Sequence, residues 1–219
     1  MKSVFVFKNI VLVLFLIMMQ HNASAFSVPK VPGLGGGGVD VDSLLAAQGD
    51  VVKTLSSSLR NLTAAQILMA EALGLKEEAA SARELSSSLE SGDLSGKDDI
   101  KKAVSNSVST QEKINSTIAE GAVLSAESKL QFGKSLLPYG KGSFGMVKTG
   151  QKAKAQAESV SQTKNPMVLR KVGTLLYVAK NTPKLLKTFS GSTKALLKFA
   201  RSNGIDTSDI ESEMDLMGD

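Results

Sequence analysis

The chain has 219 residues, a formal net charge of +5, no cysteine and a single histidine, His21. Without cysteine, and with its only histidine in a segment expected to be removed, the protein lacks disulfides, thiolate nucleophiles, Cys/His zinc sites and Ser-His-Asp catalysis. We therefore assign no catalytic, metal-binding or cofactor-binding residue, and expect a protein that is not an enzyme.

Residues 1–25 have the features of a secretory signal peptide. Lys2 and Lys8 precede an apolar run at 10–19, and Ala23-Ser-Ala25 fits the small-residue rule for cleavage. The apolar run is about half the ~20 residues that a membrane-spanning helix needs, so a retained anchor is the less favoured alternative. We predict cleavage after Ala25 and export. The lack of cysteine favours a bacterial periplasm over a eukaryotic secretory route.

Residues 26–41 are rich in glycine and proline and predict a flexible leader before a single helical domain at 42–204. Within that domain, 45–73 carry apolar residues at heptad spacing, a pattern typical of a long helix. Gly74 is expected to end this helix, and a second helix is expected near 76–90. The heptad seam at 45–73 also suggests an alternative function, a structural or adaptor bundle that pairs with a second copy or another protein.

The next segments predict further helices. The capping pattern at Ser95–Asp98 begins a third helix, so 42–137 are expected to form long helical hairpins. Residues 138–164, which begin with Pro138, predict a kinked or broken junction between helices.

The end of the domain, 165–204, is expected to hold two basic amphipathic helices. Asn165-Pro166 and Thr182-Pro183 each predict a helix start, and the second helix should stop near Gly204. The fold class is therefore all-α, a helical bundle or extended helical hairpins of about five or six helices. Residues 205–219 are expected to form a disordered acidic tail.

The stretch 140–147, GKGSFGMV, matches the glycine-rich loop that covers the ATP phosphates in protein kinases. A kinase loop joins two strands and is followed by HRD and DFG motifs, whereas here the flanks favour helix and neither motif follows. We interpret the match as coincidence and predict no nucleotide binding. The small residues are instead expected to let a neighbouring helix pass close by, with Phe144 and Met146 packed inward.

Charge is unevenly distributed along the chain. Residues 26–128 carry a net −5, while 129–201 contain 15 Lys and Arg and a single acid, Glu158, for +14. Residues 202–219 contain six acids and no base, for −6. A segment of +14 repels itself unless anions lie nearby. The acidic first half, the acidic tail folding back, or an external anion would each supply them.

The last two expected helices place apolar residues on one side and cations on the other. This pattern is typical of a bundle surface and also of a helix that binds an anionic membrane surface. The candidate anionic-surface-binding residues are Arg170, Lys171, Lys180, Lys184, Lys187, Lys194, Lys198 and Arg201, with Phe189 and Phe199 as candidate apolar anchors.

The expected partner of these residues is an anionic lipid, lipopolysaccharide or acidic polysaccharide of the cell envelope. The acidic tail would gate this surface by competing for the same cations. Nucleic acid is not expected as a partner, because the segment contains no recognisable nucleic-acid-binding module and only two arginines for base contacts.

Overall fold

The computed structural model describes residues 41–218, apart from 93, 95 and 161–165. This part of the chain is helical apart from short connecting segments and contains no strand, so the all-α prediction is confirmed. It has seven helices, where we expected about five or six. The predicted signal peptide and all of the leader except Val41 lie outside the described residues.

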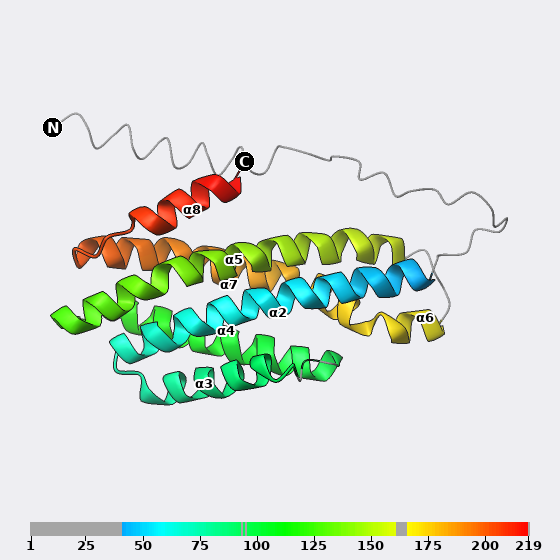
Figure 1. The fold of residues 1–219 in the computed structure, drawn as a ribbon, viewed down its shortest axis with the longest axis horizontal. Helices are drawn as coiled ribbons and strands as arrows, with labels where there is room; N and C mark the ends of the chain where they lie inside the picture. The colour runs from blue at the N-terminus through cyan, green and yellow to red at the C-terminus, as the bar shows by residue number, and fades with distance from the viewer. Residues whose placement is uncertain (1–40, 93, 95, 161–165, 219) are drawn as a thin grey trace. The chain divides into compact units, whose positions relative to one another are not determined.

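The long helices of the described part form one bundle (Figure 1). In chain order the helices are α2 (Val41–Ala72), α3 (Lys76–Glu90), α4 (Lys97–Ala119), α5 (Ala126–Val160), α6 (Pro166–Lys171), α7 (Gly173–Ser202) and α8 (Ser208–Gly218). Helices α2, α5, α7 and α4 contact one another in that order around a shared core, and α3 packs against α2 and α4. Among the described helices, none is both long and apolar enough to cross a membrane.

Helix α2 forms and ends as its sequence predicts. Gly74 adopts a φ of +73°, which L side chains rarely tolerate, and the chain leaves the helix there. The heptad-spaced Leu55, Leu59, Leu62 and Met69 are fully buried. The seam of α2 therefore faces the interior of its own bundle, where it supplies a large part of the apolar core.

Residues 138–160 continue α5 as one helix, so the break that we considered for the junction at 138–164 does not occur within these residues. Pro138 lacks the amide hydrogen that a helix interior needs, so close packing must offset its cost. A Cβ atom placed on Gly142 would come within 2.7 Å of the backbone nitrogen of Leu62, and one on Gly145 would collide with the hydroxyl of Ser58. Two of the three glycines that resemble a nucleotide loop, Gly142 and Gly145, thus lie at the contact between α5 and α2.

The side chains beside those glycines differ in burial. Met146 is buried, as predicted. Phe144 is only half-buried, and the Nζ atom of Lys148 lies 4.5 Å from the centre of its ring. Phe144 therefore lies at the edge of the core rather than inside it.

Helix α7 runs through Pro183, where we expected a helix to begin. The Asn181 side chain donates a hydrogen bond to the carbonyl of Tyr177 at 2.8 Å, and the Thr182 hydroxyl donates one to the carbonyl of Val178 at 2.9 Å. Side chains thus bind carbonyls in the turn that the proline weakens. The break between α6 and α7 falls at Val172 instead.

A buried polar cluster joins α2, α4 and α7. The Gln66 side chain donates to the carbonyl of Ser107 at 2.7 Å and accepts from the Ser107 hydroxyl at 3.0 Å. Gln111 donates to Asn115 at 3.0 Å, and Asn115 donates to the hydroxyl of Ser192 at 2.6 Å. Because unpaired polar groups are costly inside a core, this cluster fixes how α4 sits against its neighbours.

Candidate anion-binding face

Six of the cations selected from the sequence lie along the outer side of α7. These six, which we call the α7 row, are Lys180, Lys184, Lys187, Lys194, Lys198 and Arg201, and all are exposed. Their separations of three, four or seven residues place them on one side of the helix. At 1.5 Å per residue the row is about 32 Å long.

The other two selected cations, Arg170 and Lys171, lie on α6 and are exposed as well. The joint between α6 and α7 is held by α2, since the Gln48 side chain donates to the carbonyl of Lys171 at 3.0 Å and accepts from the amide of Leu175 at 3.2 Å. These two cations belong to a separate short helix and are not members of the α7 row.

The two candidate apolar anchors lie in the core, which corrects their role. Phe189 is fully buried and Phe199 is 8% exposed. The ring of Phe199 meets that of Phe132 edge to face at 5.2 Å, and the carbonyl of Phe189 accepts a hydrogen bond from the Tyr139 hydroxyl at 3.2 Å. The apolar side of α7 is the bundle core, so neither ring is available to a surface.

Helix α5 adds cations that the sequence selection missed. Lys134, Lys141 and Lys148, here called the α5 row, are exposed and recur every seven residues. This spacing was the available signal, but it has meaning only if 126–160 form one helix. Because we expected a junction at 138–164, we did not predict that these three lysines lie on one side of a single helix.

The two rows run along neighbouring helices of opposite direction. Phe132 of α5 contacts Phe199 of α7, and at the other end Gly150 lies so close to Thr182 that an added Cβ would come within 2.6 Å of its methyl group. Helices α5 and α7 are therefore antiparallel and in contact. Phe132 and Gly150, which face α7, each lie two residues from a member of the α5 row, and two residues span about 200° of a helix, so the α5 row points away from α7.

The acidic end of the chain forms α8, where we expected a disordered tail. Ile210 is 1% exposed, and a Cβ atom on Gly140 of α5 would come within 2.9 Å of its side chain. Small residues on α5 thus leave room for α8. A helix this short is marginal alone, so docking of Ile210 accounts for the order that the sequence did not predict.

Two ion pairs connect α8 to both cation rows. Glu213 lies 4.0 Å from the Nζ atom of Lys141 in the α5 row. Glu211 lies 2.6 Å from the guanidinium of Arg201 in the α7 row. Helix α8 therefore bridges α5 and α7 and brings acidic side chains to one member of each row.

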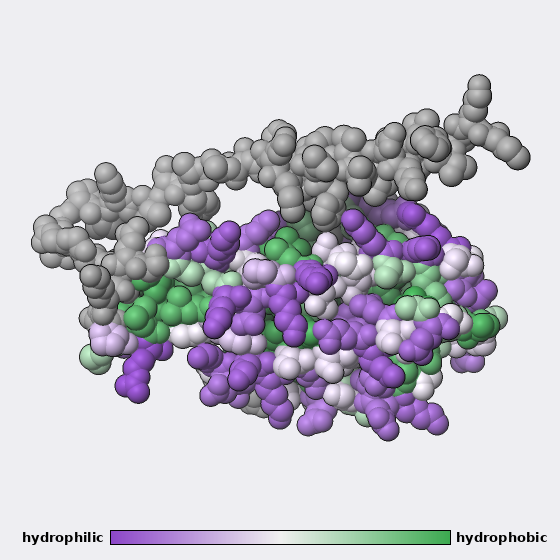
Figure 2. All heavy atoms as spheres, turned by 180° about the vertical axis from the view of Figure 1, so that it is seen from behind, coloured by the Kyte–Doolittle hydropathy of each residue, from purple (hydrophilic) through white to green (hydrophobic). Residues whose placement is uncertain are grey.

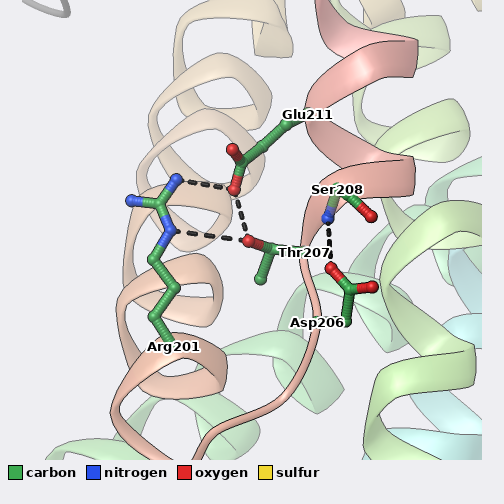
Figure 3. Close-up of polar contacts among 5 residues, drawn as sticks. All are labelled: Arg201, Asp206, Thr207, Ser208 and Glu211. Carbon is green, nitrogen blue, oxygen red and sulfur yellow. Dashed lines mark hydrogen bonds and ion pairs between the residues drawn. The ribbon is translucent and has the colours of Figure 1, made fainter.

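The first turn of α8 is organised around Glu211 (Figure 3). Its carboxylate accepts hydrogen bonds from the Thr207 hydroxyl and from Arg201, while Asp206 accepts one from the amide of Ser208 at 2.9 Å. Partial burial opposes ionisation of Glu211, but the bond from Thr207 and the charge of Arg201 outweigh it and lower its pKa. The bond from Ser208 lowers the pKa of Asp206.

Seen from the side opposite to Figure 1, the described surface is mostly hydrophilic, with small separate apolar areas (Figure 2). Large exposed apolar side chains are scattered, as at Val123 and Leu130. A contact made on the side seen in Figure 2 would therefore depend more on charge than on insertion of an apolar patch.

Other parts of the described chain offer weaker sites. A hollow of about 800 Å³ between α3 and α4 is lined by three acids and three lysines among serine and threonine residues, which gives no net preference for an anion. Among the residues described, no group of three or more His, Cys, Asp or Glu is arranged to hold a metal ion.

The chain was also compared with known proteins. No protein-family model, no curated protein and no solved structure matches it.

Proposed function

We propose that this is an exported, non-enzymatic helical protein whose α7 row contacts an anionic envelope surface or polymer. The observation that carries the proposal is the α7 row. Its six cations are exposed along one side of α7, while the apolar side of the same helix is buried in the core. Cations in this arrangement attract lipid phosphates or sugar carboxylates over a Debye length. Because Phe189 and Phe199 are buried, the proposed contact is electrostatic.

The first test is co-sedimentation of chain 26–219 with vesicles of phosphatidylcholine alone and with 30% phosphatidylglycerol, at about 50 and 500 mM salt. The proposal expects binding to the anionic vesicles at low salt and loss at high salt. A parallel arm with polygalacturonate separates a lipid surface from an acidic polymer. Absence of binding to both anions at low salt would overturn the proposal.

A matched pair of variants locates the contact. Changing Lys180, Lys184 and Lys187 to Gln should weaken binding by about 100-fold, since each lysine near an anionic membrane contributes about 1 kcal/mol. Changing Lys101, Lys102 and Lys113 of α4 to Gln removes the same charge from another helix and should have a much smaller effect. Equal losses in the two variants would indicate net charge rather than a specific face.

The alternative function, an adaptor bundle, would need a surface other than the one first expected. The seam at 45–73 faces α5 and the core, and its central members Leu59 and Leu62 are fully buried. Pairing through that seam would require the bundle to open. Analytical ultracentrifugation at micromolar concentration tests self-association by any other surface.

A further inference from the structure

Helix α8 places acidic side chains beside one cation of each row. Its acids include Asp209, Glu211, Glu213 and Asp215, and it ion-pairs with Lys141 of the α5 row and Arg201 of the α7 row. The two rows and the bridging helix are thus chemically complementary. An anion that binds Lys141 or Arg201 competes with these carboxylates for the same charge.

The attachment of α8 is weak enough to be displaced. Among residues 208–215, Ile210 is the one fully buried side chain, seated against Gly140. The pair of Arg201 and Glu211 is exposed, with side-chain exposures of 60% and 41%. Exposed ion pairs contribute little and are screened by salt.

The connection to α7 allows α8 to move as a unit. Gly204 has a φ of +71°, and the short segment from 203 to 207 is the chain connection between the two helices. A change of backbone angles after Ile205, which itself packs against the core, would swing α8 away from α5.

We infer that α8 is a displaceable acidic strap, which competes with the anionic surface for Lys141 and Arg201 and so lowers affinity while it is docked. This inference rests on the proposed function. Displacement of α8 frees both cations and also removes four carboxylates from the neighbourhood of the two rows.

A disulfide lock tests the strap directly. The chain contains no cysteine, so Gly140→Cys with Ile210→Cys introduces a single possible pair. A Cβ on residue 140 would lie 2.9 Å from Cγ1 of Ile210, a closeness compatible with the ~3.5–4.5 Å between Cβ atoms that a disulfide needs. Oxidation holds α8 on α5, and reduction of the same sample releases it.

The measurement is partition of both forms onto vesicles with 30% phosphatidylglycerol. We expect the reduced form to bind at least about tenfold more tightly than the oxidised form, which corresponds to ~1.4 kcal/mol. The parent chain, treated with the same reductant, contains no thiol and should not change. Equal binding of the two forms, or tighter binding of the oxidised form, would overturn the strap and leave the proposed function standing.

A second variant tests the strap without altering the core. Glu211→Gln with Glu213→Gln removes the two carboxylates that pair with the rows, and should strengthen vesicle binding more than Glu77→Gln with Glu78→Gln on α3, which changes net charge equally. Equal gains in the two pairs would contradict a local strap. Failure of every form to bind would overturn the proposed function and the strap together.

Discussion

Gly142 lies against Leu62 so closely that an added Cβ would come within 2.7 Å of both the backbone nitrogen and Cγ of Leu62. The carbonyl oxygen of Ser58 would lie 2.9 Å from the same atom. Two of these three neighbours are backbone atoms of α2, which cannot move aside as a flexible side chain can. This contact sets the separation of α2 and α5, and it explains the glycine-rich stretch in structural terms.

Gly142→Ala should therefore destabilise the protein by about 1–3 kcal/mol through overpacking. Gly191→Ala is the matched control, because Gly191 is helical, exposed and has nothing within 4 Å of an added Cβ. The control should stabilise by about 0.5–1 kcal/mol. Urea unfolding followed by circular dichroism measures both changes, and a neutral or stabilising Gly142→Ala would contradict the close contact.

Gln66→Leu should cost about 1–3 kcal/mol, because it leaves the buried hydroxyl of Ser107 without its acceptor. Leu is similar in volume, so the loss reports the hydrogen bonds rather than a cavity. In a double-mutant cycle with Ser107→Ala, the two changes should be non-additive by at least about 0.5 kcal/mol. Exposed Gln151→Leu should change stability by less than about 0.5 kcal/mol. Additive effects would show that Gln66 and Ser107 are not coupled.

Pro183→Ala should stabilise the protein. The proline lies inside α7 and is exposed, so alanine restores a helix hydrogen bond without losing core contacts. We expect a gain of about 1–2 kcal/mol, after allowance for the added freedom of the unfolded chain. Thermal unfolding by calorimetry measures it. A loss of stability would contradict the view that Pro183 weakens α7.

Docking of α8 should weaken in acid. The pKa of Glu211 is lowered in the folded state, so the stabilisation is present above the ordinary glutamate pKa of about 4.3 and is lost as pH falls through the lowered value. The lowered pKa of Asp206 acts in the same direction. Hydrogen-exchange protection factors of amides in 208–213 should fall below about pH 4. In the variant Glu211→Gln with Asp206→Asn, the loss of protection in acid should largely disappear. If the variant lost protection as much as the parent chain, these two carboxyls would be excluded as the cause.

Phe189→Ala should destabilise the protein by about 3–5 kcal/mol, since a fully buried ring leaves a cavity in the core. Leu130→Ala is a surface control, because Leu130 is 71% exposed, and its effect should stay within about 0.5 kcal/mol. Chemical denaturation measures both. If Phe189→Ala left stability unchanged but weakened vesicle binding, Phe189 would be an apolar anchor for the membrane and not a core residue.

Local sequence signals predicted much of the fold. The turn glycines Gly74 and Gly204 both adopt positive φ where helices were expected to end, and α3 has the bounds expected from its pattern. These predictions succeed because helix termination and amphipathic spacing depend on a few neighbouring residues. The exposure of the selected cations on α7 follows in the same way, since a charged side chain opposite an apolar stripe faces water.

Local signals were misleading where the structure depends on contacts between residues far apart in the chain. Pro138 and Pro183 indicate helix breaks by their local chemistry, yet α5 and α7 continue through them because packing along both helices offsets the missing hydrogen bonds. The acidic tail has a composition typical of disorder, yet it forms α8. Ile210 of this helix packs against Gly140, some 70 residues earlier in the chain.

By itself, the sequence determined the helical class, several helix ends and the strong segregation of charge, because each depends on residue type and short-range spacing. Only the tertiary structure decided that Phe189 and Phe199 belong to the core, that the α5 row lies on a helix beside the α7 row, and that α8 lies across both. An amphipathic pattern shows that one side of a helix avoids water. What covers that side is set by contacts between residues far apart in the chain.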